Sequence, residues 1–266
     1  MTPSRTSQTV AVTRSEFARP HSASGDPEAQ RRLCEGMRGG NIGRLLPSLA
    51  ARTRFFDEQV IGEISAGTRQ VVILGAGYDD RALRFRTTGV RFFELDHPAT
   101  QADKAQRLTA MNAANGPVLA PADFSRDDVS GVLAACGHDP GQRSLFICEG
   151  LLVYLDQPTC LRLLTALRAR AAAGSTLAAS LAVHSDGLDS ARVLDVANSR
   201  RPNSAAEPWV TILPAAAHLD LLTRAGWQPA RSVDAAELGT GAEPGRSLLV
   251  TAHPAEDARN PAGPAA

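Results

Sequence analysis

The chain has 266 residues, of which 43% are hydrophobic and 21% charged, enough to bury the core of one large α/β domain or two small ones. Its 28 basic and 28 acidic side chains give a formal net charge of zero, which offers no sign of nucleic acid or an anionic membrane as a partner. The sequence shows no secretory leader, no membrane span of about 20 apolar residues and no CxxC pair among its four cysteines. We therefore expect a reduced, cytoplasmic protein that holds no metal.

The composition changes along the chain and divides it into three parts. Residues 1–44 form a polar segment and helical arm, and we expect about the first 25 of these residues to be mobile. Residues 45–253 carry the apolar patterning of one domain, over whose functional site the arm could close. Residues 254–266 are rich in proline and alanine and are expected to be a disordered tail.

Seven apolar runs predict strands. They lie at residues 70–77, 90–96, 116–123, 143–150, 175–183, 230–236 and 246–254. The first five alternate with helix-like segments, a pattern typical of a parallel sheet covered on both faces. The last two follow one another with only residues 237–245 between them, which indicates a hairpin. The expected fold is a Rossmann-like α/β fold with a seven-stranded, mostly parallel sheet, a C-terminal antiparallel hairpin strand and helices on both faces.

The clearest helix is predicted at residues 158–174. Four apolar side chains recur there at helical spacing: Cys160, Leu163, Leu164 and Leu167. Asp156 and Pro158 suit the start of this helix, and Gly174 suits its end. A second helix of the same plan is expected at 214–225, with Gly226 after its last turn.

The first strand runs into a glycine loop, "VVILGAGYDDR", at residues 71–81. Gly75 and Gly77 lack a Cβ, as a backbone close to a nucleotide-like ligand requires. The dinucleotide fingerprint needs a third glycine where this chain has Asp80, and Asp79 and Asp80 would repel a pyrophosphate. A sulfonium cofactor with an ammonium group would instead suit nearby carboxylates. The alternative is a tight turn with Asp79 as helix cap.

Further polar residues follow the next three strands. Asp96, at the end of "RFFELD", could accept hydrogen bonds from both ribose hydroxyls, or it could cap the next helix. Asp123 and Phe124 pair an acceptor with an aromatic ring, as an adenine requires. Glu149 follows the apolar run "LFIC", where most α/β folds bind ligands, although a structural salt bridge would also explain it.

Together, "RQVVILGAGYDDRALRF", "FFELDHPATQADKAQRL", "ADF" and "CEGLLVYLDQPTCLRLLTAL" resemble the leucine carboxyl methyltransferase-like family. This family is a branch of the class I S-adenosylmethionine-dependent methyltransferases and includes bacterial O-methyltransferases of polyketide and other natural-product pathways. The resemblance covers about residues 45–185, with weaker agreement around "EPWVTILP" and "LLTRAGW".

The resemblance implies S-adenosyl-L-methionine as cofactor and a role for each matching position. The glycine loop would lie against the methionine part, Asp96 would hold the ribose, and Asp123 with Phe124 would frame the adenine. Glu149 would line the methionine end. The implied cofactor residues are Arg52, Gly75, Ala76, Gly77, Asp96, Asp123, Phe124 and Glu149.

Arg52 is the best match to the arginine that pairs with the cofactor carboxylate in the family. It shares a helical stripe with Leu49, Phe56 and Val60, so it is expected to point inward, where an arginine needs an anion. A structural bridge to a core carboxylate is the alternative. Arg54 is expected to be solvated instead.

Methyl transfer from a sulfonium needs a base only when the acceptor arrives protonated. The candidates are His184, after the fifth strand, and Tyr154, after the fourth, although a lone loop histidine is commonly a bystander. Trp209, in "EPWVTI", could line an acceptor pocket or could simply be a packed aromatic. The weak case for a base favours a carboxylate or an acidic hydroxyl as the acceptor.

The sequence thus predicts an S-adenosylmethionine-dependent O-methyltransferase acting on a small molecule such as a polyketide or other secondary metabolite. The expected partner is this acceptor, without nucleic acid or membrane, and the protein is expected to be a monomer or homodimer. Two alternatives are an NAD(P)-dependent oxidoreductase and an S-adenosylmethionine-binding protein without methyl transfer. Methylation of a protein's C-terminal carboxylate is a third.

Overall fold

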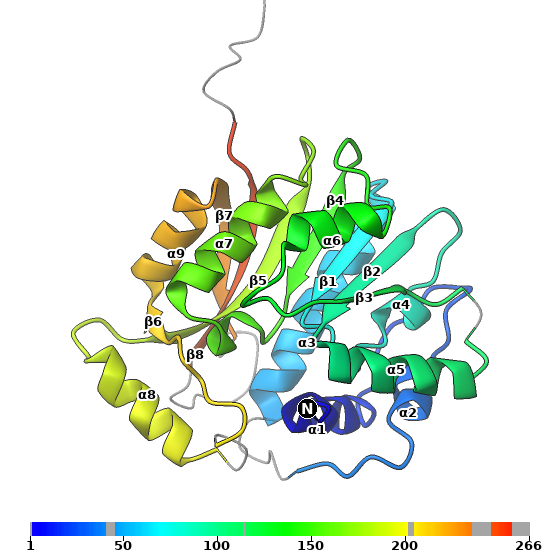
Figure 1. Cartoon of the computed structure of the whole chain (residues 1–266), viewed down its shortest axis with the longest axis horizontal. Helices are drawn as coiled ribbons and strands as arrows, with labels where there is room; N and C mark the ends of the chain where they lie inside the picture. Colours follow the sequence, from blue (N-terminus) through cyan, green and yellow to red (C-terminus); the bar gives the residue numbers. More distant parts are fainter. Residues whose placement is uncertain (1, 41–45, 114, 202–204, 236–245, 257–266) are drawn as a thin grey trace, which may run out of the picture.

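The computed structural model describes residues 2–40, 46–113, 115–201, 205–235 and 246–256. Its strands form one sheet in the order β3-β2-β1-β4-β5-β8-β7, with a short β6 paired to β5. Strands β1 to β5 run parallel, whereas β8 lies antiparallel to both β5 and β7 (Figure 1). The order reverses direction between β1 and β4, where open α/β sheets bind their ligands.

The strands are β1 (Gln70–Leu74), β2 (Arg91–Asp96), β3 (Val118–Pro121), β4 (Ser144–Cys148), β5 (Thr176–His184), β6 (Leu213–Pro214), β7 (Trp227–Asp234) and β8 (Arg246–Pro254). The α-helices are α1 (Arg5–Arg14), α2 (Ala29–Leu33), α3 (Leu46–Ser65), α4 (Arg81–Arg84), α5 (Pro98–Ala110), α6 (Val129–Ala135), α7 (Gln157–Arg168), α8 (Ser190–Ser199) and α9 (Ala215–Arg224). A 3-10 helix, η2 (Leu152–Tyr154), follows β4.

Two apolar layers cover the sheet, because alternate residues of each strand point to opposite faces. On one face α6, α7 and α9 pack against side chains such as Val72, Phe93 and Phe146. On the other face α3 and α4 pack against side chains such as Ile73 and Ile147. A third cluster joins α1 and α2 to the loop after β1 through Ala11, Leu33, Cys34 and Tyr78. This cluster brings the N-terminal arm to the carboxyl ends of the strands.

The predicted α/β fold is confirmed, including the parallel β1–β5 and the closing antiparallel β7–β8 pair. The two-residue β6 was missed, because so short a strand leaves no apolar run in the sequence. Asp156 caps α7 as predicted, since its side chain accepts the Thr159 N–H, but α7 ends at Arg168, well before Gly174. The predicted connection at 237–245 lies outside the described residues.

The expectation of a mobile N-terminal segment is wrong for residues 5–14, which form α1 and bury Ala11, Thr13 and Arg14. Little of this helix is apolar, so its sequence hides the fact that Arg14 docks on a buried carboxylate. Of the tail predicted at 254–266, only residues 254–256 are described, and Pro254 ends β8. No helix in the described ranges is both long and apolar enough to cross a membrane.

Candidate functional site

The glycine loop turns sharply between β1 and α4. Gly75 and Gly77 both have positive φ angles, 63° and 49°, which side chains other than hydrogen disfavour. A Cβ on Gly75 would come within 3.0 Å of Leu151, and one on Gly77 within 2.7 Å of Ser7 in α1. The absence of a Cβ at these two positions therefore allows the turn itself and also lets Leu151 and Ser7 pack against the loop. Ala76 is buried between them and belongs to the core behind the loop.

Asp96 joins this loop to the end of β2. Its Oδ2 accepts the Gly77 N–H at 2.6 Å, and its Oδ1 accepts the His97 N–H at 2.6 Å. Burial raises the pKa of Asp96, although both backbone donors act to lower it. Because each carboxylate oxygen can accept two hydrogen bonds, one site on each remains for a ligand. The alternative role as a helix cap is not seen, since His97 caps α5.

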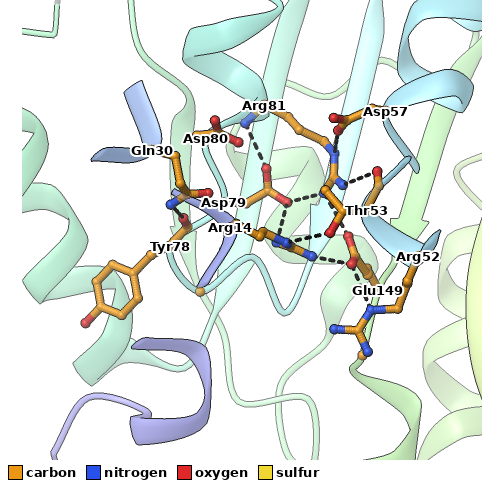
Figure 2. A network of polar contacts seen from close by, with 12 residues as sticks. Arg14, Gln30, Arg52, Thr53, Asp57, Tyr78, Asp79, Asp80, Arg81 and Glu149 are labelled. Atoms are coloured by element: carbon orange, nitrogen blue, oxygen red, sulfur yellow. Dashed lines mark hydrogen bonds and ion pairs between the residues drawn. The ribbon is translucent and has the colours of Figure 1, made fainter. Parts of the chain in front are cut away.

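Behind the loop lies a network of buried ion pairs, drawn in part in Figure 2. Four carboxylates and five guanidiniums form it: Asp57, Asp79, Asp80 and Glu149 with Arg14, Arg19, Arg52, Arg81 and Arg84. The arginine side chains are 7% exposed or less, apart from Arg52 at 23%. One positive charge is therefore left over, and Arg52 is its most accessible carrier.

Glu149, after β4, is the point where three arginines meet. Arg52 donates to its Oε1 at 2.9 Å, Arg81 donates to its Oε2 at 2.8 Å, and Arg14 also donates to Oε1 (Figure 2). Burial raises the pKa of Glu149, but the three guanidiniums outweigh it and hold the pKa below its usual range. Glu149 is thus ionised, and it orients Arg14 and Arg52 at the end of β4. Of the two roles weighed for Arg52, the structure shows the bridge to a core carboxylate, Glu149, and pairing with the cofactor carboxylate stays a prediction.

The prediction that Asp79 and Asp80 offer negative charge to the cofactor is wrong. Both carboxylates are buried, 4% and 1% exposed. Asp79 pairs with Arg81 and Asp80 with Arg84 and Arg19, so neither offers free negative charge to a ligand. The argument failed because the sequence does not reveal which arginines neutralise these carboxylates.

Asp123 and Phe124 follow β3 at the same edge of the sheet. The Asp123 carboxylate accepts the Ser125 N–H at 3.0 Å and the Ser125 hydroxyl at 2.6 Å, and these bonds lower its pKa. Phe124 is partly buried against the core. Oδ2 of Asp123 has only a long contact with Arg126, at 3.7 Å. This oxygen is the group that an adenine amino donor would need.

His184 has neither of its ring nitrogens available. Nδ1 lies 2.8 Å from the Ser185 carbonyl oxygen and therefore carries the proton, while Nε2 lies 2.8 Å from the Ser190 hydroxyl. These bonds tie β5 to the start of α8. The geometry gives His184 a structural role and departs from its prediction as a base.

Tyr154 and Trp209 come together around an arginine that the sequence analysis missed. Arg201 donates to the Tyr154 hydroxyl at 3.1 Å, and its guanidinium lies 4.4 Å from the Trp209 ring centroid. The 209–211 segment is fixed beside η2, since the N–H groups of Val210 and Thr211 donate to the Val153 carbonyl. The candidate base Tyr154 and the candidate acceptor-pocket residue Trp209 therefore share Arg201 as a neighbour.

The sequence belongs to a known family by direct comparison. The model of the leucine carboxyl methyltransferase family matches residues 8–168, from within α1 to the end of α7. This chain is a member of the leucine carboxyl methyltransferase family. The family match begins well before residue 45, so it includes most of α1 and with it Arg14. The family match therefore covers more of the N-terminal arm than the sequence resemblance indicated.

Relatives and solved structures agree with this membership. An inferred S-adenosyl-L-methionine-dependent methyltransferase of Streptomyces avermitilis is 39% identical over 63% of this chain and 58% of its own length. One from Frankia alni is 38% identical over 63% and 57%. The chain spans less than two thirds of the length of these relatives.

The solved structures show the fold. An inferred methyltransferase from Thermobifida fusca matches with a TM-score of 0.59 and 16% identity, over 90% of this chain and 97% of its own. Magnesium protoporphyrin IX methyltransferase from Synechocystis PCC 6803, solved with bound SAH, matches with a TM-score of 0.55 and 15% identity, over 86% and 94%. The family member described here thus has the class I methyltransferase fold.

Sequence reasoning missed most of the buried network of this family member. Asp57 carried a usable signal, because it lies four positions after Thr53 and falls with Phe56 and Val60 in the buried stripe of α3. Arg14, Arg19 and Arg201 offered none, since each lies in a polar stretch and acquires its role only through distant partners.

Proposed function

We propose that this protein is an S-adenosyl-L-methionine-dependent O-methyltransferase that acts on a carboxylate or acidic hydroxyl of a small molecule. The observation that carries the proposal is the joint presence of Asp96 at the end of β2 and of the accessible Arg52 of α3, which pairs with Glu149 after β4. The family membership and the names of the relatives support the same reading.

The residues present fit this cofactor. Asp96 keeps an acceptor site on each oxygen for the two ribose hydroxyls, and Oδ2 of Asp123 can accept from the adenine amino group. Arg52 and Arg14 carry the unbalanced positive charge that a carboxylate would neutralise. The amino-acid end of the cofactor would therefore lie near Glu149, which holds both guanidiniums in place.

The bound cofactor supplies an electrophilic methyl: an acceptor oxygen forms the O–CH₃ bond as the S–CH₃ bond breaks and its electron pair returns to sulfur. The chain's part is to hold the acceptor oxygen in line and to exclude water. Helix α1 contributes to that exclusion, because Ser7 lies against Gly77. A carboxylate acceptor needs no base, which agrees with the engaged nitrogens of His184.

The test is methyl transfer from cofactor labelled in its methyl group to a panel of small carboxylic acids and phenols. Alkali releases the label as methanol from a methyl ester but leaves a methyl ether intact, so one treatment separates the two acceptor classes. Asp96→Ala is the variant that must lose transfer with every acceptor. The exposed Arg54→Ala variant serves as its matched control.

Alkali-labile label that depends on Asp96 supports carboxylate methylation, and alkali-stable label supports methylation of a hydroxyl. Label transferred to nitrogen or carbon of the acceptors would contradict O-methylation. Cofactor binding without transfer to any member of a broad panel would favour the alternative, a binding protein without methyl transfer.

A further inference from the structure

The guanidinium of Arg201 lies between two aromatic rings. It stands 4.4 Å from the centroid of Trp209 and 5.5 Å from that of Tyr154, within the range of cation–π attraction. Its remaining contacts are neutral: the Tyr154 hydroxyl at 3.1 Å, the Glu207 backbone carbonyl at 3.0 Å and the Asn198 side-chain oxygen at 3.4 Å. The aromatic rings therefore fix this half-buried cation without neutralising it.

No carboxylate of the described residues pairs with Arg201, although one lies close in sequence. The two carboxylate oxygens of Glu207 accept the backbone N–H groups of Arg5 and Thr6, at 3.0 and 3.1 Å. Glu207 thus caps the positive end of α1, where a carboxylate is favourable. Since the neighbouring acid is engaged elsewhere, the charge of Arg201 is left for a ligand.

Contacts of Glu207 also link the Arg201 region to the glycine loop. The first turn of α1 joins the two regions, because Thr6 is bound by Glu207 while the next residue, Ser7, lies against Gly77. On the other side, Tyr154 ends η2, which follows directly on the Glu149 segment after β4. A ligand held by Arg201 would therefore lie on the side of the molecule where the first turn of α1 meets the glycine loop.

Two buried polar atoms have no hydrogen-bond partner among the described residues: Nε1 of Trp209, whose ring lies against Arg201, and Oγ1 of Thr6, whose backbone N–H donates to Glu207. A buried polar group without a partner is unfavourable, so such groups call for an explanation. Both can donate a hydrogen bond, and the guanidinium supplies further donors. A ligand group with several acceptor sites and a negative charge would satisfy all three.

We propose that Arg201, Trp209 and Thr6 form the acceptor subsite and bind a carboxylate group of the acceptor. This inference rests on the proposed function, and it names the residues that choose the acceptor. Arg201 is a specificity-determining residue here, distinct from Arg14 and Arg52 on the cofactor side. Glu207 and Thr6 link this subsite to the first turn of α1.

The test uses small carboxylates and their uncharged amides as probes: benzoate with benzamide, and phenylacetate with phenylacetamide. Each probe is titrated into the full chain saturated with S-adenosylhomocysteine, and tryptophan fluorescence is followed. The chain has two tryptophans. Trp227 is 0% exposed and donates to the Leu164 carbonyl, so a change on probe binding reports Trp209. The variants are Arg201→Met and Thr6→Val, with the exposed neighbour Arg200→Met as matched control.

We expect each acid to bind at least about tenfold more tightly than its amide, because a charge-assisted pair is lost in the amide. Arg201→Met should weaken acid binding about ten- to a hundredfold and abolish the preference, while its affinity for S-adenosylhomocysteine stays unchanged. Thr6→Val should weaken acid binding severalfold, and Arg200→Met should behave like the wild type.

Two results would overturn the subsite but not the proposed function. In the first, the protein binds S-adenosylhomocysteine but binds the acids and the amides equally or not at all. In the second, the preference for acids survives in Arg201→Met. Failure of S-adenosylhomocysteine to bind the wild type would instead overturn the proposed function, and the subsite would fall with it.

Discussion

Replacing Arg52 by Met separates the cofactor role of this arginine from its structural role. Met keeps most of the aliphatic length of the side chain and removes the charge. Arg52 makes one hydrogen bond to Glu149, at 2.9 Å, and its side chain is 23% exposed. Glu149 would keep Arg14 and Arg81 after the change, so no buried charge would be left unpaired.

The magnitudes follow from these contacts. Loss of one partly exposed pair should cost below about 1 kcal/mol of unfolding free energy, or a Tm shift below about 4 °C. Loss of a charge-assisted bond to the cofactor carboxylate should cost about 1.5–3 kcal/mol, which weakens binding about 10- to 150-fold. The effect on the cofactor should therefore far exceed the effect on stability.

The assay is calorimetric titration with S-adenosylhomocysteine and with 5′-methylthioadenosine, which has the same nucleoside and thioether but no carboxylate. Arg52→Met should weaken the first ligand and leave the second unchanged, and Arg54→Met, on the exposed side of α3, should change neither. Equal weakening of both ligands, or unchanged binding of S-adenosylhomocysteine, would refute the assignment of Arg52.

Three further changes test other parts of the structure. Burial raises the pKa of Asp57, but the surrounding guanidiniums outweigh it and lower the pKa to about 2, so the stabilisation from this group is present above pH 4 and is lost as pH falls from about 4 to 2. Asp57→Asn should therefore lower the free energy of unfolding at pH 7 by about 2 kcal/mol or more, and urea titrations should show that this free energy falls less steeply between pH 4 and 2 than in the wild type. The same pH dependence in the variant and the wild type would contradict this. Asp96→Asn should weaken S-adenosylhomocysteine and 5′-methylthioadenosine alike, by about tenfold or more, and calorimetry that shows weakening of only one would exclude a ribose contact. Glu207→Gln should speed amide hydrogen exchange in the first turn of α1 up to about fivefold, since the charge at this helix end contributes about 0.3–1 kcal/mol; exchange identical to the wild type would contradict the cap.

The sequence predicts the fold well because its strands are apolar runs whose order and spacing allow few topologies. The short apolar runs within residues 70–77 and 143–150 are typical of buried strands. The lack of a helical segment between the last two predicted strands indicates that they pair antiparallel. Asp96 was also predictable, since a carboxylate at the end of a buried strand lies at the ligand-binding edge of a parallel sheet.

Most of the charge network could not be predicted, because its pairs other than Asp79–Arg81 and Asp80–Arg84 join residues far apart in the chain. Arg14 meets Glu149 across 135 positions, and Arg52 meets Glu149 across 97. A polar stretch such as residues 5–14 carries no apolar stripe, so sequence patterns treat it as solvated. The contacts that bury one side of α1, such as Arg14 with Glu149, form only in the folded chain.

The glycine loop is assigned to a sulfonium nucleoside rather than to a dinucleotide. Calorimetric titration of the wild-type protein with S-adenosylmethionine, S-adenosylhomocysteine and NADH tests it most directly. We predict micromolar binding of the two sulfur nucleosides, its loss in Asp96→Ala, and no binding of NADH. Binding of NADH without binding of either sulfur nucleoside would contradict the account.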